Sequence, residues 1–393
     1  MNSQQIKQTD AEYILPTYAR FNLCLVKGKG CTAQTPEGDT YLDFTSGIGV
    51  NSLGWCDDEW AAAVAAQAAT LQHTSNLFYT EPATQLAQSL CQRTGMAKVF
   101  FGNSGAEANE AAIKAARKYS LDKYGEGRST IITLQNSFHG RTMATLTATG
   151  QPSFHQHFGP FLPGFVYLPA NDITALQAAL TPGVCAVMFE PVQGEGGVVA
   201  LTAEYQQALQ SLCNTNDVLL IADEVQTGVG RTGTFLACEQ AGITPDIVTL
   251  AKGLGSGLPI GAALFNQKCA GTLGSGTHGS TFGANPVCCA GANVVLNRLT
   301  PAFLAEVTQK ANLLKTGLLA LPGVASVTGL GLMLGVDFTN GLTAGAVQQA
   351  ALQNGLLCLL AKNKLRLLPP LVITTEEIQT GLQILQKTLE GLQ

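Results

Sequence analysis

Short apolar segments alternate with longer alanine-rich segments through most of the chain. The short segments are rich in Val, Ile and Leu and have no polar face, which is typical of buried strands in a largely parallel sheet. They occupy residues 99–101, 131–134, 184–189, 218–222, 247–250 and 261–265. The segments between them, such as residues 107–119 and 204–214, have the spacing and composition of helices that cover a sheet. This alternation predicts a doubly wound α/β sheet.

The pattern changes after residue 300. A helical stretch extends to residue 319, a glycine-rich segment covers residues 323–335, and an amphipathic helix begins near residue 375. We expect residues 61–300 to form a large domain, with residues 1–60 and 301–393 combining into a smaller α+β domain. No internal repeat and no linker rich in Pro and Ser separates independent modules.

Composition narrows the class of protein further. Of the 393 residues, 46% are hydrophobic and 12% are charged, as in a folded chain with a large core. The 22 Lys and Arg and the 27 Asp and Glu give a net charge of −5 without long runs of one sign, so we expect no nucleic-acid partner. The N-terminus has no apolar signal region, and no apolar run approaches ~18 residues. We therefore expect a soluble, cytoplasmic protein without a membrane partner.

The 11 cysteines predict neither a disulfide framework nor a zinc site. They are scattered, they form no C-x-x-C pair, and Cys288 and Cys289 are adjacent. We expect buried thiols in a reducing compartment and no bound metal. His155 and His157 lack accompanying ligands, and we interpret them as loop histidines.

Two residues with distinctive chemistry come at the ends of predicted strands. The apolar segment 218–222 ends at Asp223, and the segment 247–250 leads to Lys252. The carboxyl edge of an open α/β sheet is where such folds bind ligands. A lysine with a lowered pKa at that edge is the nucleophile of Schiff-base chemistry. Together the two residues favour pyridoxal phosphate, which a lysine holds as an imine and whose ring nitrogen a carboxylate keeps protonated. Asp223 alone could equally be a helix cap or an ion-pair partner.

Further candidates would lie at the same edge. Residues 102–110 combine a glycine turn with the start of a helix that favours a phosphate, although Ser104 could simply cap an ordinary helix. Phe138 could stack on a flat cofactor or belong to the core, and Arg141 could hold a carboxylate or form a surface ion pair. The polar, glycine-rich residues 274–286 predict a long functional loop.

Six motifs resemble, in the same order, those of the class III, subgroup II, aminotransferases. They are Ser104-Gly-Ala-Glu-Ala-Asn-Glu110, Phe138-His-Gly-Arg141, Glu190-Pro-Val-Gln-Gly-Glu-Gly-Gly197, Asp223-Glu-Val-Gln-Thr-Gly-Val-Gly-Arg-Thr-Gly233, Ala251-Lys-Gly253 and Ser280-Thr-Phe-Gly283. With residues 365–370 the likeness covers nearly the whole chain. The resemblance implies the pyridoxal 5′-phosphate-dependent transferase fold type I. It also implies a mostly parallel seven-stranded sheet in the large domain, a smaller domain from both chain ends, and a homodimer with shared active sites.

The same resemblance implies a role for each matching residue. Lys252 and Asp223 are the implied catalytic residues, which carry the cofactor and pair with its ring nitrogen. The implied cofactor contacts are Ser104, Gly105, Ala106, Phe138, Asp223, Glu224, Val225, Gln226, Lys252 and Thr281, the last reaching the phosphate in the partner subunit. The implied substrate contacts are Arg141, Ser280, Glu195, Arg366 and Tyr18. Glu195 is expected to pair with Arg366 for the amino donor and to release it when the 2-oxoglutarate α-carboxylate binds.

The implied reaction moves the terminal amino group of N2-acetylornithine to 2-oxoglutarate, giving N-acetylglutamate 5-semialdehyde and glutamate in arginine biosynthesis. Ornithine, succinylornithine and 4-aminobutyrate are the alternative donors. Ala284 replaces a second glycine of the family pattern, and we expect this methyl group only to adjust a loop. Trp55-Cys-Asp-Asp58 replaces a His-x-His-Pro type of segment near the family's active-site entrance, so it bears on substrate breadth. A dinucleotide-dependent oxidoreductase is the remote alternative, because residues 228–233 and 274–279 match G-x-G-x-x-G without the helix and acidic strand end of that fingerprint.

Overall fold

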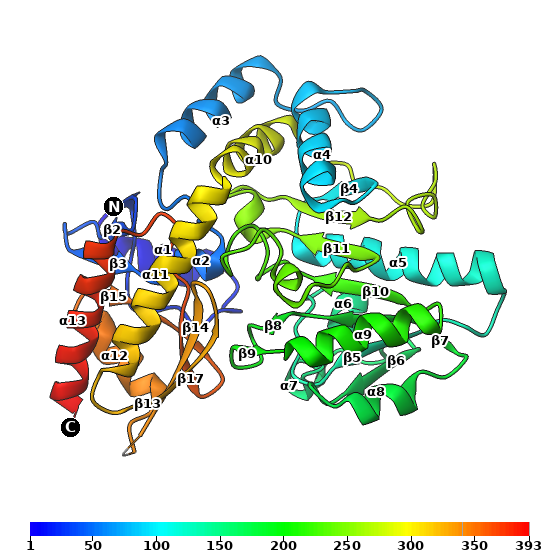
Figure 1. Cartoon of the computed structure of the whole chain (residues 1–393). Helices are drawn as coiled ribbons and strands as arrows, with labels where there is room; N and C mark the ends of the chain where they lie inside the picture. The colour runs from blue at the N-terminus through cyan, green and yellow to red at the C-terminus, as the bar shows by residue number, and fades with distance from the viewer. Residues whose placement is uncertain (340, 393) are drawn as a thin grey trace.

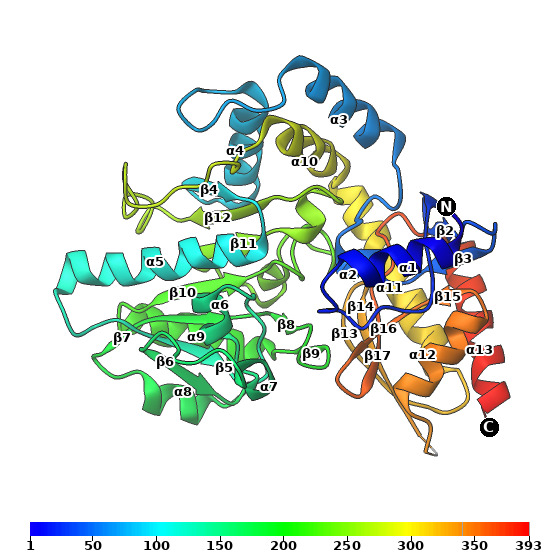
Figure 2. The same cartoon turned by 180° about the vertical axis from the view of Figure 1, so that it is seen from behind.

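A seven-stranded sheet is the centre of the computed structural model, which describes residues 1–339 and 341–392 (Figures 1 and 2). In spatial order its strands are β4 (Lys98–Gly102), β12 (Gly261–Phe265), β11 (Ile247–Leu250), β10 (Leu219–Asp223), β7 (Val184–Phe189), β5 (Thr130–Leu134) and β6 (Phe165–Leu168). β12 runs antiparallel to both β11 and β4, and the other neighbours pair in parallel. The expected α/β fold with a mostly parallel seven-stranded sheet is confirmed.

Helices cover both faces of this sheet. Those of the large-sheet region are α3 (Asp58–Thr70), α4 (Glu81–Thr94), α5 (Gly105–Tyr124), α6 (Met143–Ala148), α7 (Pro152–His155), α8 (Ile173–Ala179), α9 (Ala203–Thr215), α10 (Pro286–Arg298) and the 3-10 helices η1 (Ala237–Ala241) and η2 (Lys252–Leu254). Side chains alternate along each strand, so Ile131 and Leu219 pack in one apolar cluster with the alanines of α5, while Ile132 and Leu220 pack in another with α8 and α9. α9 lies in front in Figure 1 and α5 in Figure 2.

Both ends of the chain combine beside the large sheet. Their elements are α1 (Ser3–Tyr13), β1 (Lys27–Lys29), β2 (Thr32–Gln34), β3 (Thr40–Asp43), α2 (Ser46–Gly49), α11 (Pro301–Leu319), β13 (Val324–Leu330), β14 (Met333–Phe338), α12 (Ala344–Gln353), β15 (Leu356–Leu357), β16 (Leu359–Ala361), β17 (Lys364–Leu367) and α13 (Thr375–Leu392). β3 pairs in parallel with β15, which joins the two ends in one sheet, and a second sheet has the order β13-β14-β17-β16. The domain boundaries at residues 60 and 300 stay a prediction.

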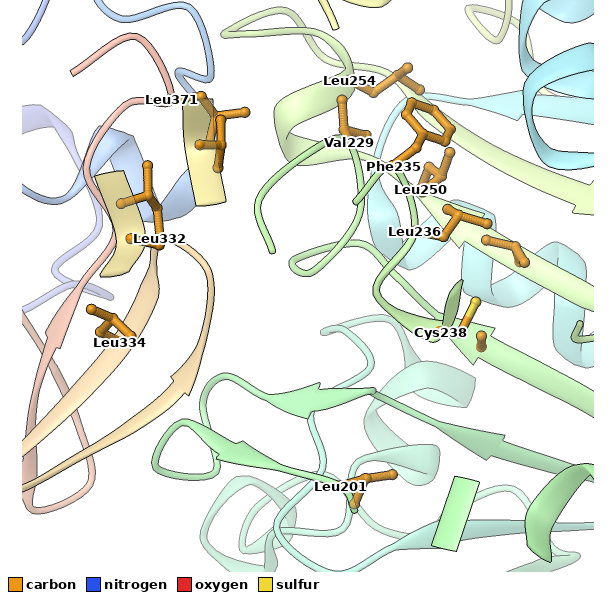
Figure 3. Packing of buried hydrophobic residues seen from close by; sticks show 14 of the residues in the cluster. Leu201, Val229, Phe235, Leu236, Cys238, Leu250, Leu254, Leu332, Leu334 and Leu371 are labelled. Atoms are coloured by element: carbon orange, nitrogen blue, oxygen red, sulfur yellow. The ribbon is translucent and has the colours of Figure 1, made fainter. Parts of the chain in front are cut away.

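Several loops of the large sheet meet at one edge. β10 ends at Asp223, β11 leads to Lys252, β4 leads into α5, and β5 leads into the loop that contains Phe138. The hairpin β8 (Val192–Gln193) and β9 (Val199–Ala200) follows β7 at this same edge. One apolar cluster joins the edge to the C-terminal sheet, with Val229 and Leu250 on one side and Leu332 and Leu371 on the other (Figure 3).

The described residues offer neither a membrane span nor a metal cluster of the usual kind. No single helix among them has the length and hydropathy of a span, and α10 with α11 reaches both only as a pair bent by 76°. No group of three or more His, Cys, Asp or Glu side chains in this part of the chain could hold a metal ion. The cysteines are all free thiols.

Candidate active site

A cavity of about 460 Å³ opens at the carboxyl edge of the large sheet. The turn after β4, the loop after β5 and the segments after β10 and β11 build its wall. The predicted residues that line it are Ser104, Gly105, Ala106, Phe138, Arg141, Asp223, Val225, Gln226 and Lys252. The fold therefore brings together side chains from four motifs that are far apart in the sequence.

Lys252 lies two residues after the end of β11 and begins η2 with a backbone φ of 41°, a conformation that non-glycine residues rarely adopt. Burial lowers the pKa of the Lys252 ammonium below its ordinary value. The positive charge of Arg366 also lowers this pKa, whereas the carboxylates of Glu195, Asp223 and Glu190 raise it. A neutral amine is thus more available near neutral pH than on an ordinary lysine, and that is the state a nucleophile requires.

Asp223, at the end of β10, is almost fully buried and is oriented by its neighbours. Its Oδ2 accepts from Asn109 Nδ2 at 2.8 Å and lies 2.8 Å from His139 Nδ1, while its Oδ1 accepts from Val225 N at 3.1 Å. Asn109 is fixed in turn by Thr249 Oγ1, which donates to its Oδ1 at 2.7 Å. Asn109 and His139 line the cavity but were not predicted as site residues, although each belongs to one of the motifs.

The N-terminus of α5 faces the cavity. Ser104 caps the helix, because its Oγ accepts from Glu107 N at 3.2 Å. Gly105 and Ala106 are the first helical residues, so their N–H groups have no acceptor within the helix. A Cβ on Gly105 would come within 2.6 Å of Val225 Cγ1, so this close approach requires glycine. The two free N–H groups and the helix dipole form an anion site.

Phe138 and Arg141 form the wall opposite. Phe138 N donates to Glu190 Oε2 at 2.9 Å, and the Phe138 ring meets the Phe154 ring edge-on with 5.6 Å between centroids. The Arg141 guanidinium lies 4.2 Å from the Phe154 centroid, which holds it at the rim of the cavity. Burial and the charge of Asp223 raise the pKa of Glu190 well above its ordinary value. Glu190 lines the cavity and was missed in the sequence, although it begins one of the motifs.

A buried ion pair lies beside these groups. Arg366, on β17, donates from Nη1 to Glu195 Oε1 at 2.6 Å and to Gln226 Oε1 at 3.5 Å. The side chains are 4% exposed for Arg366 and 27% exposed for Glu195. Burial raises the pKa of Glu195, but the charge and hydrogen bond of Arg366 outweigh it, so this pKa lies below its ordinary value and the carboxylate is ionised at neutral pH. Arg366 Nε has no hydrogen-bond partner among the described residues, which leaves a buried donor for a further ligand.

Glu224 does not line the cavity that it was expected to contact. Adjacent side chains of an extended segment point to opposite sides, so Glu224 faces away from the side that Asp223 occupies. Its carboxylate accepts from Thr227 Oγ1 at 2.5 Å, Ala237 N at 2.9 Å and Cys238 N at 2.8 Å. Glu224 therefore organises the loop that follows β10.

Ser280, Thr281 and Tyr18 also lie outside the cavity of this chain. Ser280 Oγ accepts from Asn103 Nδ2 at 3.0 Å, which connects it to the cavity wall through Asn103. Thr281 is exposed in the same loop, and Tyr18 is 73% exposed in the segment after α1. In the described part of a single chain, none of these three residues lines the cavity that Lys252 lines, and their predicted roles stay predictions.

The residues at the cavity fit pyridoxal phosphate group by group. The free N–H groups of Gly105 and Ala106 suit a phosphate, and the oriented carboxylate of Asp223 suits a protonated ring nitrogen. The Lys252 amine suits the aldehyde carbon, and the Phe138 ring offers an apolar face. A volume of about 460 Å³ is also in the range of cofactor sites.

Comparison with known proteins places these features in context. The family model described as "Aminotransferase class-III" matches residues 13–389. A curated relative, the acetylornithine aminotransferase of Haemophilus ducreyi, is 58% identical over 393 residues and covers 100% of both chains. The solved ornithine aminotransferase of Toxoplasma gondii is 32% identical with a TM-score of 0.94, covering 100% of this chain and 96% of that one. The N-acetylornithine aminotransferase of Stenotrophomonas maltophilia is 35% identical with a TM-score of 0.84, covering 98% of each chain.

Proposed function

Because this chain belongs to the class III aminotransferases, we propose that it transfers the terminal amino group of N2-acetylornithine to 2-oxoglutarate, giving N-acetylglutamate 5-semialdehyde and glutamate. The full-length likeness to the acetylornithine aminotransferase of Haemophilus ducreyi is the observation that carries the choice of donor. The pair of Glu195 and Arg366 supports the use of two substrates with different charges. The activity belongs to arginine biosynthesis in the cytoplasm, a reducing compartment in keeping with the free thiols of this chain.

Lys252 performs the covalent and proton-transfer work in this proposal. Pyridoxal phosphate, on which class III aminotransferases depend, supplies an electron sink for the substrate carbon that loses a proton. The Nζ of Lys252 would hold the cofactor, and as a free amine it would accept a proton from the reacting carbon and return it. Its lowered pKa supports this role, because only the neutral amine can accept that proton.

In this proposal the other cavity residues bind and orient the cofactor. Asp223, fixed by Asn109 and His139, presents a negative charge to the ring nitrogen. The N–H groups of Gly105 and Ala106 bind the phosphate, and Ser104 maintains the helix start that supplies them. Phe138 would offer its ring as an apolar surface for the cofactor, and Val225 and Gln226, which also line the cavity, would provide further contacts.

Arg366 and Glu195 distinguish the two substrates. With the amino donor bound, Glu195 neutralises Arg366, so no buried charge is left unpaired beside a neutral acetamido chain. With 2-oxoglutarate, Glu195 moves away and Arg366 binds the α-carboxylate through a charge-assisted contact. Arg141, whose guanidinium lies over Phe154 at the cavity, would hold the carboxylate of the donor. Ser280, which accepts from Asn103 of the cavity wall, would add a second substrate contact.

The two half-reactions can be tested separately by visible absorption of the purified, cofactor-loaded enzyme. N2-acetylornithine alone should bleach the visible band of the cofactor, and 2-oxoglutarate added afterwards should restore it, as a ping-pong mechanism requires. Ornithine, succinylornithine and 4-aminobutyrate should bleach the band at least about 10-fold more slowly at equal concentration. If one of these three amines bleached the band faster than N2-acetylornithine, that amine would be the preferred donor instead. If no amine bleached the band, the proposed transamination would be contradicted.

We also propose a homodimer with shared active sites, in which Thr281 of each subunit reaches the phosphate in the other. An exposed apolar segment supports this assembly: Leu77, Phe78 and Tyr79 follow one another on the surface, with Tyr79 as exposed as in an extended chain. Phe282, next to Thr281, is exposed as well. Contiguous apolar surface of this kind is typical of a protein interface.

Sedimentation velocity should give a species of twice the chain mass of 41.0 kDa. The substitution Tyr79→Glu should shift it toward the monomer, because it would bury a charge in the apolar interface. The matched control Leu319→Glu changes an exposed apolar residue at the end of α11 and should leave the mass unchanged. A wild-type enzyme that is active as a monomer would overturn the proposed assembly.

A further inference from the structure

Arg231 is a buried cation outside the cavity that the mechanism does not use. It lies in the loop after β10, is 2% exposed, and ranks among the largest fully buried side chains. No carboxylate among the described residues forms a direct ion pair with it. Burying a guanidinium costs several kcal/mol unless its N–H donors are satisfied by hydrogen bonds. The acceptors that satisfy the Arg231 donors therefore indicate what this buried side chain does.

The Arg231 guanidinium ties together segments that are far apart in the sequence. Its Nη1 donates to Leu332 O at 3.0 Å and to Pro369 O at 2.5 Å, and its Nη2 donates to Ser46 Oγ at 3.4 Å. Its own main-chain oxygen accepts from Leu332 N at 3.0 Å, so Arg231 and Leu332 bond in both directions. Two of the three acceptors of the guanidinium are main-chain carbonyls, so the hydrogen bonds fix the backbone at Leu332 and Pro369.

These contacts converge on the strand that carries Arg366. Leu332 directly precedes β14, whose Gly335 lies opposite Arg366 on β17. Pro369 comes just beyond the end of β17. Because β14 and β17 are antiparallel, the start of β14 and the end of β17 lie at the same end of the strand pair. Arg231 therefore fixes that end, and Pro369 follows Arg366 by three residues.

Two further features reinforce the same link. Ser46 Oγ donates to Leu368 O at 2.5 Å, so the segment around Pro369 is held from a second side. A Cβ on Gly331 would approach Thr232 Cα to 2.4 Å, so the turn before β14 lies directly on the loop that carries Arg231. The same loop supplies Gln226, whose Oε1 lies 3.5 Å from Arg366 Nη1.

The carboxylate of Asp43 stabilises the positive charge of Arg231 without a direct ion pair. Burial lowers the pKa of Arg231 to about 10, while the carboxylate of Asp43 opposes this shift, so the guanidinium is protonated at neutral pH. Asp43 Oδ1 accepts from Thr45 N at 2.7 Å and from Ser46 N at 2.9 Å, which fixes the segment that carries Ser46 Oγ. The chain thus uses two buried, opposite charges to hold one loop against β14 and β17.

We infer that Arg231 is a positioning residue for Arg366: by fixing the backbone at the end of β17 and at the adjacent start of β14, it holds the Arg366 guanidinium where it can alternate between Glu195 and a substrate carboxylate. The inference rests on the proposed use of Arg366 for 2-oxoglutarate. Affinity for a dicarboxylate should depend on Arg231, whereas binding of the amino donor, during which Arg366 stays neutralised by Glu195, should depend on it much less.

The substitution Arg231→Lys tests this selectivity in the cofactor-loaded enzyme. A lysine ammonium lacks the planar fork and cannot satisfy Leu332 O, Pro369 O and Ser46 Oγ together. Glutarate, a dicarboxylate without the reactive oxo group, serves as a binding probe for titration calorimetry. We expect its dissociation constant and the KM for 2-oxoglutarate to rise about 10-fold, with the KM for N2-acetylornithine changing less than about 3-fold.

Arg128→Lys is a matched control at the opposite edge of the large sheet. The Arg128 guanidinium also donates to main-chain carbonyls, those of Val184 at 2.9 Å, Asn216 at 2.8 Å and Asp217 at 2.9 Å. Its substitution should lower the melting temperature and leave the ratio of the two KM values unchanged. An equal loss for both substrates in Arg231→Lys, as from a general loss of stability, would overturn the inference.

A milder variant covers the case in which Arg231→Lys does not fold. Ser46→Ala removes the hydroxyl that joins Arg231 Nη2 to Leu368 O. It should raise the dissociation constant for glutarate about 3-fold while the KM for N2-acetylornithine stays constant. If glutarate affinity were unchanged in Ser46→Ala, the positioning role of Arg231 would be overturned, and the proposed role of Arg366 would not be affected. If wild-type enzyme bound glutarate no better than Arg366→Ala, the proposed role of Arg366 would fall first and this inference with it.

Discussion

Replacing Lys252 by alanine should abolish transamination and leave a folded protein that still binds pyridoxal phosphate. In the proposed mechanism the variant loses the amine that holds the cofactor and the base that moves the proton, and the proton transfer alone is worth about 10²- to 10⁴-fold in rate. The proposed phosphate contacts of Gly105 and Ala106 and the carboxylate of Asp223 are untouched, so cofactor binding should persist without the covalent bond. Lys252 belongs to neither of the two large apolar clusters, so its truncation should leave them intact.

Single-turnover rates with N2-acetylornithine and the visible spectrum of the loaded protein measure both parts of this expectation. The absorption band of lysine-bound cofactor should be replaced by that of the free aldehyde. Lys118→Ala is the control, because Lys118 lies on exposed α5 surface in an ion pair with Asp122 at 2.7 Å. An unchanged spectrum in Lys252→Ala would show that Lys252 does not hold the cofactor. If the missing amine causes the loss of activity, added ethylamine should restore part of that activity.

The large sheet could be predicted because most of its strands are buried on both faces. Each of the predicted apolar segments corresponds to a strand, and a strand with no polar face cannot be mistaken for a loop. β6 escaped prediction because it is an edge strand, in which Val166 is exposed while Leu168 is buried. The reversed direction of β12 also lies beyond sequence reasoning, since an apolar run carries no information on its orientation.

The site was predictable where a functional residue ends a buried strand. Asp223 and Lys252 have that position, and a charge there contradicts the preceding apolar pattern. Asn109, His139 and Glu190 were missed because their partners come from other segments: Asp223 for the first two and the main-chain N–H of Phe138 for Glu190. Periodicity along one segment cannot reveal partners that a different segment supplies.

The contact between Glu195 and Arg366 also could not be predicted from sequence patterns alone. The two residues are 171 positions apart, and only the resemblance to a family suggested that they meet. Their contact depends on the packing of the C-terminal sheet against the β8–β9 hairpin, through residues such as Val198 and Met333 in one apolar cluster. Composition and spacing do not encode such a contact, whereas the folded chain does.

Replacing Arg366 by alanine should raise the KM for 2-oxoglutarate about 100-fold and leave the first half-reaction with the amino donor within a few-fold of wild type. Truncating one partner of a buried, charge-assisted contact costs about 3 kcal/mol, which corresponds to the 100-fold change. The donor meets Arg366 only in its neutralised state, and Glu195, whose side chain is 27% exposed, is accessible to water when Arg366 is removed, so donor binding should lose little. Stopped-flow measurement of each half-reaction checks the two numbers independently.

The partner variant Glu195→Gln should act in the opposite direction, which makes the pair testable as a switch. Without the negative charge Arg366 is free for a carboxylate, so the KM for 2-oxoglutarate should fall, while the KM for the donor should rise because a buried cation is then left unpaired beside a neutral chain. Arg298→Ala, which breaks partly exposed ion pairs with Asp57 and Glu59, is the control and should change neither value. If Glu195→Gln and Arg366→Ala both weakened 2-oxoglutarate binding to the same extent, the two residues would form a fixed structural bridge, and the enzyme would have to distinguish its substrates elsewhere.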